Sequence, residues 1–241
     1  CRCGTCANTS AVNRQHLAAL APSAAERIVR QHHGVDLELF RPAPPLPPAN
    51  ALRILAVGSL APRKGYPILL QSLAWLVQDT EAILTIVGVG PEQRETEALA
   101  ERLGVRQRIT FAGAVAEADM PVYYARADAV VLTAVPNRHW GIPNSVLEAL
   151  ACCRPVVVTA LPALAAVFGK EELLLLRVDG EEDLARQTAA ALRRLARDPD
   201  LRSRLGQAGR KKIEALFDLR QVGQAMAACL RNAAGMPRES R

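Results

Sequence analysis

The chain has 241 residues, of which 50% are hydrophobic and 22% are charged, and its net charge is +6 at pH 7. That length is enough for one large or two small domains with a real core. No apolar run reaches the roughly 18–20 residues needed to cross a bilayer, and no signal peptide is visible. Because the chain opens with Cys1 instead of Met, we expect it to be a piece of a longer protein.

The basic excess suits anionic partners such as phosphorylated ligands, an anionic membrane surface or nucleic acid. Aromatic residues make up only 4% of the chain, and no nucleic-acid-binding motif is present, so nucleic acid is not expected as a partner. Cys1, Cys3 and Cys6 lack a nearby His at a familiar zinc spacing, so no metal site is expected there.

Residues 10–20 are predicted to be helical. The segment 41–50, RPAPPLPPAN, contains five prolines and can hold neither a helix nor a strand ladder. It is predicted to be a stiff, extended connector.

After this connector, apolar strands alternate with helices. The predicted strands are 53–59, 82–88, 108–113, 128–134, 154–160 and 173–178. The predicted helices are 67–79, 91–104, 117–127, 143–153, 181–198, 200–217 and 218–233. Continuous apolar strands with helices between them indicate a parallel sheet covered on both faces. The simplest arrangement is an α/β, doubly wound, six-stranded sheet of order 3-2-1-4-5-6, with extra C-terminal helices.

In that order the first and fourth strands are neighbours, and the loops that follow them diverge to open a ligand-binding crevice. These loops are GSLAPRKG, residues 58–65, and VPNRHWGIPNS, residues 135–145. Lys64 ends the first loop in a glycine-flanked turn, where a compact ammonium suits a phosphate group. The alternative is a solvated surface lysine.

The second loop leads into a helix through Gly141, Ile142, Pro143 and Asn144, and Pro143 is expected at the first helical position. Its free N–H groups would face the crevice and favour an anion. Glu148 lies off the apolar face of this helix, so it can accept hydrogen bonds from a pair of ligand hydroxyls such as those of a ribose. The alternative is an ordinary surface glutamate.

The second strand is followed by VGVGPE, which contains Gly88. A lone G-x-G is a weak signal and does not follow the first strand, as the dinucleotide fingerprint would. We therefore expect a loop that approaches a ligand closely, and not a nicotinamide-dependent oxidoreductase.

Four stretches together resemble the nucleotide-sugar half of retaining GT-B glycosyltransferases, the glycosyltransferase group 1 (family 4) class. They are VGSLAPRKGYPILLQSL, LTIVGVGPEQRETEALAERLGVRQRITFAGAV, GIPNSVLEALACCRPVVVT and HHGVDLELFRP. The resemblance implies that residues 1–50 are an interdomain remnant with its connector and that 51–232 form a Rossmann-like, nucleotide-sugar-binding domain. Residues 233–241 are expected to be a flexible tail.

Carried over by position, Lys64 resembles the diphosphate-binding lysine of that class. Glu148 resembles the second Glu of its Glu-x7-Glu motif, which holds the donor ribose. The turn at Gly141 resembles the one that packs against sugar and phosphate. The loops at Gly88 and Gly113 resemble those that contact the base of the nucleotide. Gly58 is also expected among the donor-binding residues.

Three departures from the class stand out. Its first motif Glu falls at Trp140, and its first-loop Arg falls at Ser59. The third departure is that these residues do not include the N-terminal acceptor domain, which supplies the other half of the cleft in that class and is expected upstream of this chain.

The resemblance predicts an enzyme that moves a sugar from a nucleotide diphosphate sugar to an acceptor hydroxyl, with no metal and no further cofactor. It also implies a cytoplasmic location, with a peripheral membrane contact or a lipid-linked acceptor as a possibility. The alternative is a non-catalytic domain that binds nucleotide sugar, which Trp140 and Ser59 motivate.

Overall fold

Six short strands rich in Val, Ile and Leu form the central sheet of the computed structural model, which describes residues 6–8, 11–42, 44, 46–47, 49–135 and 141–234. These strands are β3 (Leu52–Val57), β4 (Ala82–Val87), β5 (Ile109–Gly113), β6 (Ala129–Leu132), β7 (Val156–Thr159) and β8 (Leu174–Leu176). All neighbours are parallel, in the order β5-β4-β3-β6-β7-β8. Counted from β3, this is the predicted 3-2-1-4-5-6 order, so the predicted fold class is confirmed.

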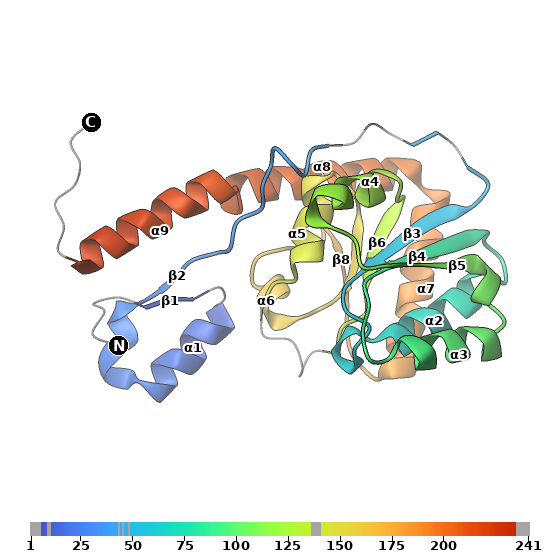
Figure 1. The fold of residues 1–241 in the computed structure, drawn as a ribbon, viewed down its shortest axis with the longest axis horizontal. Helices are drawn as coiled ribbons and strands as arrows, with labels where there is room; N and C mark the ends of the chain where they lie inside the picture. Colours follow the sequence, from blue (N-terminus) through green and yellow to red (C-terminus); the bar gives the residue numbers. More distant parts are fainter. Residues whose placement is uncertain are drawn as a thin grey trace.

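Helices cover both faces of this sheet (Figure 1). They are α2 (Tyr66–Leu76), α3 (Gln93–Arg102), α4 (Met120–Ala125), α5 (Asn144–Ala151), α6 (Pro162–Ala165), α7 (Glu181–Arg197) and α8 (Pro199–Leu216). Successive side chains of a strand point to opposite faces. Leu55 accordingly packs in one apolar cluster with Tyr124 and Leu147. Ile54 packs in the other with Leu70.

A second, smaller unit was not predicted. β1 (Cys6–Asn8) and β2 (Ile28–Arg30) form a two-stranded parallel sheet, joined through α1 (Ala11–Leu20). The helix fits the prediction for 10–20, but these strands of three residues each are too short to give a periodic signal. Figure 1 shows this unit to one side of the six-stranded domain.

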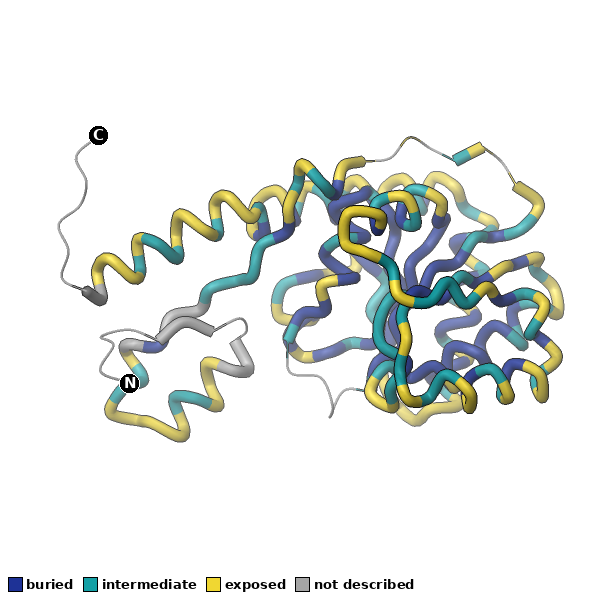
Figure 2. Tube along the Cα trace, viewed as in Figure 1, coloured by how far each residue is buried: buried dark blue, intermediate teal, exposed yellow. Residues whose placement is uncertain are grey.

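The chain enters and leaves the six-stranded domain at one place. The Val35 N–H donates to the Phe217 carbonyl at 2.7 Å, and the Leu219 N–H donates to the Val35 carbonyl at 3.0 Å. From there α9 (Leu219–Ala234) projects away from the sheet, and most of its surface is exposed or half-buried (Figure 2). This helix continues two residues into the predicted tail of 233–241, and the rest of that tail lies outside the described residues.

The described residues of the proline-rich connector lie in no helix or strand, as predicted. Two arginines of the domain hold them. Arg53 donates to the Pro47 carbonyl at 3.1 Å and Arg154 to the Pro44 carbonyl at 3.2 Å. Among the described helices, none has both the length and the apolar character that crossing a membrane requires.

Candidate functional site

The loop after β3 folds back so that Lys64 lies over Gly58. Gly58 has a φ of +149°, and a Cβ placed there would lie 2.9 Å from Cε and 3.1 Å from Nζ of Lys64. The Tyr66 hydroxyl donates a hydrogen bond of 2.8 Å to the Gly58 carbonyl and so holds this turn. The missing side chain at Gly58 therefore gives the Lys64 ammonium its place at the carboxyl end of β3.

Lys64 is half-buried, and no carboxylate of the described residues forms an ion pair with it. Burial lowers the pKa of its ammonium, and the charge of neighbouring Arg63 lowers it further. None of the ion pairs in the described part of the chain includes Lys64. A desolvated cation without a counter-charge gains from a bound anion, because the anion restores the stabilisation that water supplied.

Glycine turns pack the next two strand ends against this loop. A Cβ on Gly88, whose φ is +135°, would lie 2.1 Å from the Gly58 carbonyl oxygen and 3.5 Å from the Ser59 nitrogen. The Gly88 N–H donates to the Gly113 carbonyl at 2.8 Å. Gly113 has a φ of +70°, and within the described chain a Cβ there would meet no atom inside 4 Å. The space beside Gly113 is therefore open, while Gly58 and Gly88 are in close contact.

The segment after β6 touches the same loop. The Thr133 hydroxyl donates to the Gly65 carbonyl at 2.8 Å, and the Val135 N–H donates to the Arg63 carbonyl at 3.1 Å. A Cβ on Gly65 would lie 2.0 Å from the Thr133 carbonyl oxygen. The loops after the first and fourth strands of the sheet are thus neighbours, as the topology predicts.

The turn into α5 differs slightly from its prediction. Pro143, with φ −68° and ψ 132°, is the N-cap residue, and the helix begins at Asn144. Pro143 was expected one position further on, inside the helix. Ile142 is buried and Gly141 is half-buried, whereas Asn144 is exposed. In the described chain no side chain caps α5, and the Val146 and Leu147 N–H groups already donate to the Pro143 carbonyl. The N–H groups of Asn144 and Ser145, at the very start of the helix, therefore remain for a ligand.

Glu148 is half-buried on α5 and accepts a hydrogen bond of 2.7 Å at Oε2 from the Tyr124 hydroxyl of α4. Burial raises the pKa of the Glu148 carboxyl, the bond from Tyr124 opposes that rise, and the nearby Glu117 carboxylate adds to it. Tyr124 and Glu117 were not singled out from the sequence, because nothing in the spacing of α4 and α5 signals the contact.

His33 is a third residue that sequence reasoning did not select. A hydrogen bond joins its side chain to that of Asn144, the first residue of α5; burial lowers the pKa of His33, and this bond opposes the effect. Its Nε2 atom is buried and has no hydrogen-bond partner in the described structure. The segment that precedes the domain therefore reaches the start of α5.

The structure thus brings the predicted residues Lys64, Gly58, Ser59, Gly88 and Gly113 together. Glu148 and Asn144 lie on the neighbouring helix. In the described chain no hydrogen bond or ion pair joins Lys64 to Glu148. Trp140 lies outside the described residues.

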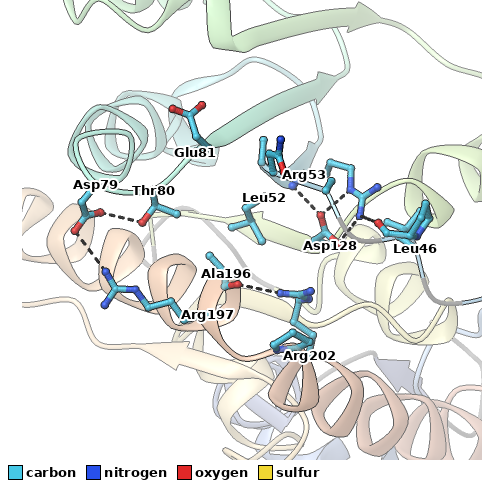
Figure 3. A pocket seen from close by; sticks show the side chains of 15 residues that line it. Leu46, Leu52, Arg53, Asp79, Thr80, Glu81, Asp128, Ala196, Arg197 and Arg202 are labelled. Atoms are coloured by element: carbon cyan, nitrogen blue, oxygen red, sulfur yellow. Dashed lines mark hydrogen bonds and ion pairs between the residues drawn. The ribbon is translucent and has the colours of Figure 1, made fainter.

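Figure 3 shows a pocket of about 450 Å³ at the opposite edge of the sheet, beside Leu52 and Arg53 at the start of β3. Its carboxylates already have partners. Asp128 pairs with Arg53 at 2.7 Å, and Asp79 pairs with Arg193 at 2.9 Å. Because these charges neutralise one another, the pocket offers an anionic ligand less than the unpaired Lys64 ammonium does.

Comparison with known proteins identifies the family of this chain. The family described as Glycosyl transferases group 1 matches residues 51–198. The lipopolysaccharide core biosynthesis glycosyltransferase LpsD of Rhizobium meliloti is 29% identical over 226 residues, which cover 88% of this chain and 62% of that protein. The curated relatives that this chain matches are longer than the chain itself, since the aligned part covers 41–62% of their length.

Solved structures share the fold. Anabaena Alr3699/HepE superposes with a TM-score of 0.80 at 21% identity, over 94% of this chain and 62% of that one. The C-terminal domain of the group 1 family protein LpcC from Francisella tularensis superposes with a TM-score of 0.66 at 21% identity. That match covers 77% of this chain and 100% of the LpcC domain. The six-stranded sheet is therefore the Rossmann-like, C-terminal half of a GT-B fold, and the chain belongs to the glycosyl transferases group 1 family.

Proposed function

We propose that this chain is the donor-binding part of a retaining glycosyltransferase and that it holds a nucleotide diphosphate sugar in the crevice between β3 and β6. The observation that carries the proposal is Lys64, a half-buried ammonium with no carboxylate partner in the described chain. It lies against Gly58 at the carboxyl end of β3. In the proposed complex it binds the diphosphate, together with the first N–H groups of α5.

Glu148 binds the ribose in this proposal. A half-buried carboxylate near a diphosphate would be repelled, whereas neutral hydroxyl groups give it two donors. The open space beside Gly113 and the turn at Gly88 receive the base. Gly141 and Ile142 are assigned to the sugar side, and Trp140 comes immediately before them in the sequence. The Anabaena structures, solved with UDP and glucose and with UDP-glucose, support a donor of this class.

The transfer step follows from these placements. The acceptor oxygen bonds to the anomeric carbon as the bond from that carbon to the diphosphate oxygen breaks, and the acceptor proton passes to the departing diphosphate or to water. Lys64 and the α5 N–H groups stabilise the negative charge that develops on the leaving group. A hexose is the proposed sugar, and the proposal uses no metal or cofactor.

The acceptor and the second wall of the cleft belong to an N-terminal domain in this proposal. The relatives' greater length supports that assignment. The proposal includes a cytoplasmic site of action with a lipid-linked or membrane-surface acceptor, because one relative is a glycosyltransferase of lipopolysaccharide core biosynthesis.

Titration calorimetry with UDP, ADP and GDP, and with the matching nucleosides, tests the proposal. Lys64→Ala should weaken the binding of whichever nucleoside diphosphate binds the parent most tightly by about ten- to a hundredfold. That is the effect of losing a charge-assisted hydrogen bond. The same change should affect the nucleoside much less. Lys170→Ala, at an exposed position, is the control. Equal loss for nucleoside and diphosphate, or no nucleotide binding by the parent chain, would contradict the assignment.

A further inference from the structure

The Glu148 carboxylate is held by one of its two oxygens. The Tyr124 hydroxyl donates to Oε2 at 2.7 Å, and this is the only hydrogen bond to the Glu148 side chain within the described chain. Oε1 is left to accept from another group. A carboxylate with one anchored and one available oxygen is suited to receiving a ligand hydroxyl in a defined direction.

Tyr124 is a rigid anchor. Its side chain is fully buried in the apolar cluster that lies between the sheet and α5. The ring meets Phe40 edge-on, with centroids 6.0 Å apart and an angle of 72° between planes. Because packing on all sides fixes this ring, the hydroxyl keeps its position when Glu148 is free of ligand.

Glu148 by itself has no such constraint. A half-buried Glu side chain loses rotamer freedom when it binds, and that loss opposes association. Its burial also favours the neutral acid, which accepts hydrogen bonds less well than the carboxylate does. A hydroxyl donor at Oε2 acts against both effects.

On the basis of the proposed function, we propose that Tyr124 is a positioning residue for the donor ribose, which anchors Glu148 Oε2 so that Oε1 is presented to the ribose hydroxyls. Tyr124 does not touch the nucleotide in this arrangement. It acts only through Glu148.

The titratable groups around this pair are few in the described chain. Glu117, just before α4, faces Glu148, and Cys152 at the end of α5 faces Tyr124. Loss of the Tyr124 hydroxyl leaves burial, and the smaller repulsion from Glu117, unopposed, so the pKa of Glu148 rises further. A role in positioning therefore has a pH signature that a purely structural tyrosine lacks.

The test compares Tyr124→Phe with Tyr123→Phe in the full chain. Both remove one hydroxyl from adjacent residues of α4, but Tyr123 has no bond to Glu148. The ligand is whichever of UDP, ADP and GDP binds the parent best, with its 2′-deoxy form. Tyr124→Phe should weaken the binding of the ribonucleotide about three- to tenfold, and it should reduce the protein's preference for the ribonucleotide over the deoxynucleotide. The pH at which affinity falls on acidification should be higher in Tyr124→Phe than in the parent. Tyr123→Phe should match the parent.

Glu148→Gln separates this inference from the proposed function. If Glu148→Gln weakens binding while Tyr124→Phe behaves like the parent, the positioning role is wrong and the ribose site stands. If Glu148→Gln has no effect, the ribose assignment fails first. In the Glu148→Gln background, Tyr124→Phe should add little further loss, and full additivity would overturn the inference. Should Tyr124→Phe not fold, Glu148→Asp keeps the charge but withdraws the carboxylate from an intact tyrosine. It should lose the preference for the ribonucleotide as Glu148→Gln does, and an Asp variant that keeps this preference would overturn the inference.

Discussion

Gly88 is in such close contact with Gly58 that Gly88 cannot carry a side chain without a backbone shift. A Cβ on Gly88 would lie 2.1 Å from the Gly58 carbonyl oxygen, and a Cβ on Gly58 would lie 2.9 Å from the Lys64 side chain. The glycines therefore bring two strand ends together and also leave room for the phosphate-binding lysine that we propose.

Gly88→Ala should destabilise the fold by at least about 2 kcal/mol, because it adds a backbone clash to a strained φ of +135°. The matched control is Gly223→Ala in exposed α9, where a Cβ would meet nothing within 4 Å. That change should stabilise by about 0.5–1 kcal/mol. Thermal and urea unfolding of both variants measure the difference, and an unchanged melting temperature for Gly88→Ala would contradict the packing described.

Nucleotide binding should weaken on acidification at a pH above the ordinary pKa of a glutamate. Burial raises the pKa of Glu148, and the ionised carboxylate accepts hydrogen bonds from the ribose hydroxyls more strongly than the neutral acid does. Affinity should therefore be full above this raised pKa and fall as pH drops through it. Calorimetry between pH 4.5 and 8 gives the profile, and Glu148→Gln should flatten it. A parent profile as flat as that of the variant would count against Glu148 as the ribose ligand.

The same carboxyl should make Glu148→Gln more stable than the parent at neutral pH. Since the folded-state pKa is raised above the unfolded value, ionised Glu148 opposes folding at every pH above the raised pKa. This cost disappears below the unfolded pKa. The stability gain of Glu148→Gln should thus grow as pH rises from the ordinary to the raised pKa. Denaturant melts at pH 4 and pH 7.5 check the sign.

Asp128 is predicted to support the fold without contributing to ligand binding. It accepts from the Arg53 backbone N–H at 2.9 Å and from its guanidinium at 2.7 and 3.0 Å. Asp128→Ala leaves a largely buried guanidinium without its partner, which should cost about 2–4 kcal/mol. Asp79→Ala, which breaks a half-exposed ion pair with Arg193, should cost much less stability than Asp128→Ala, because solvent screens this pair. Nucleotide affinity should be unchanged in both folded variants, because they lie at the opposite sheet edge.

This chain alone should bind nucleotide and transfer no sugar. The proposed acceptor domain would supply the acceptor and exclude water from the cleft. Incubation with radiolabelled UDP-glucose, GDP-mannose and ADP-glucose and a set of sugar and lipid-linked acceptors measures transfer. Robust transfer by these 241 residues would show that the upstream domain is not needed.

The sequence alone determined the sheet and its crevice. Continuous apolar strands between helices leave few topologies, because right-handed crossovers restrict how parallel strands can be connected. Lys64 and Glu148 were found from their positions after the first and fourth of these strands. Gly88 could be selected because it stands in a G-x-G loop after the second strand, whereas Gly58 and Gly113 were selected from the family resemblance.

Tertiary structure decided which side chains act with those residues. Tyr124, Glu117 and His33 reach α5 from segments distant in sequence, so no periodicity or local motif signals their contacts. The pairing of β1 with β2 is non-local in the same way. Burial of Glu148, and with it the direction of its pKa shift, depends on how α4 and α5 pack together. Hydrophobic pattern determines where helices and strands form, whereas the partner of a particular polar group depends on the angles and distances between them.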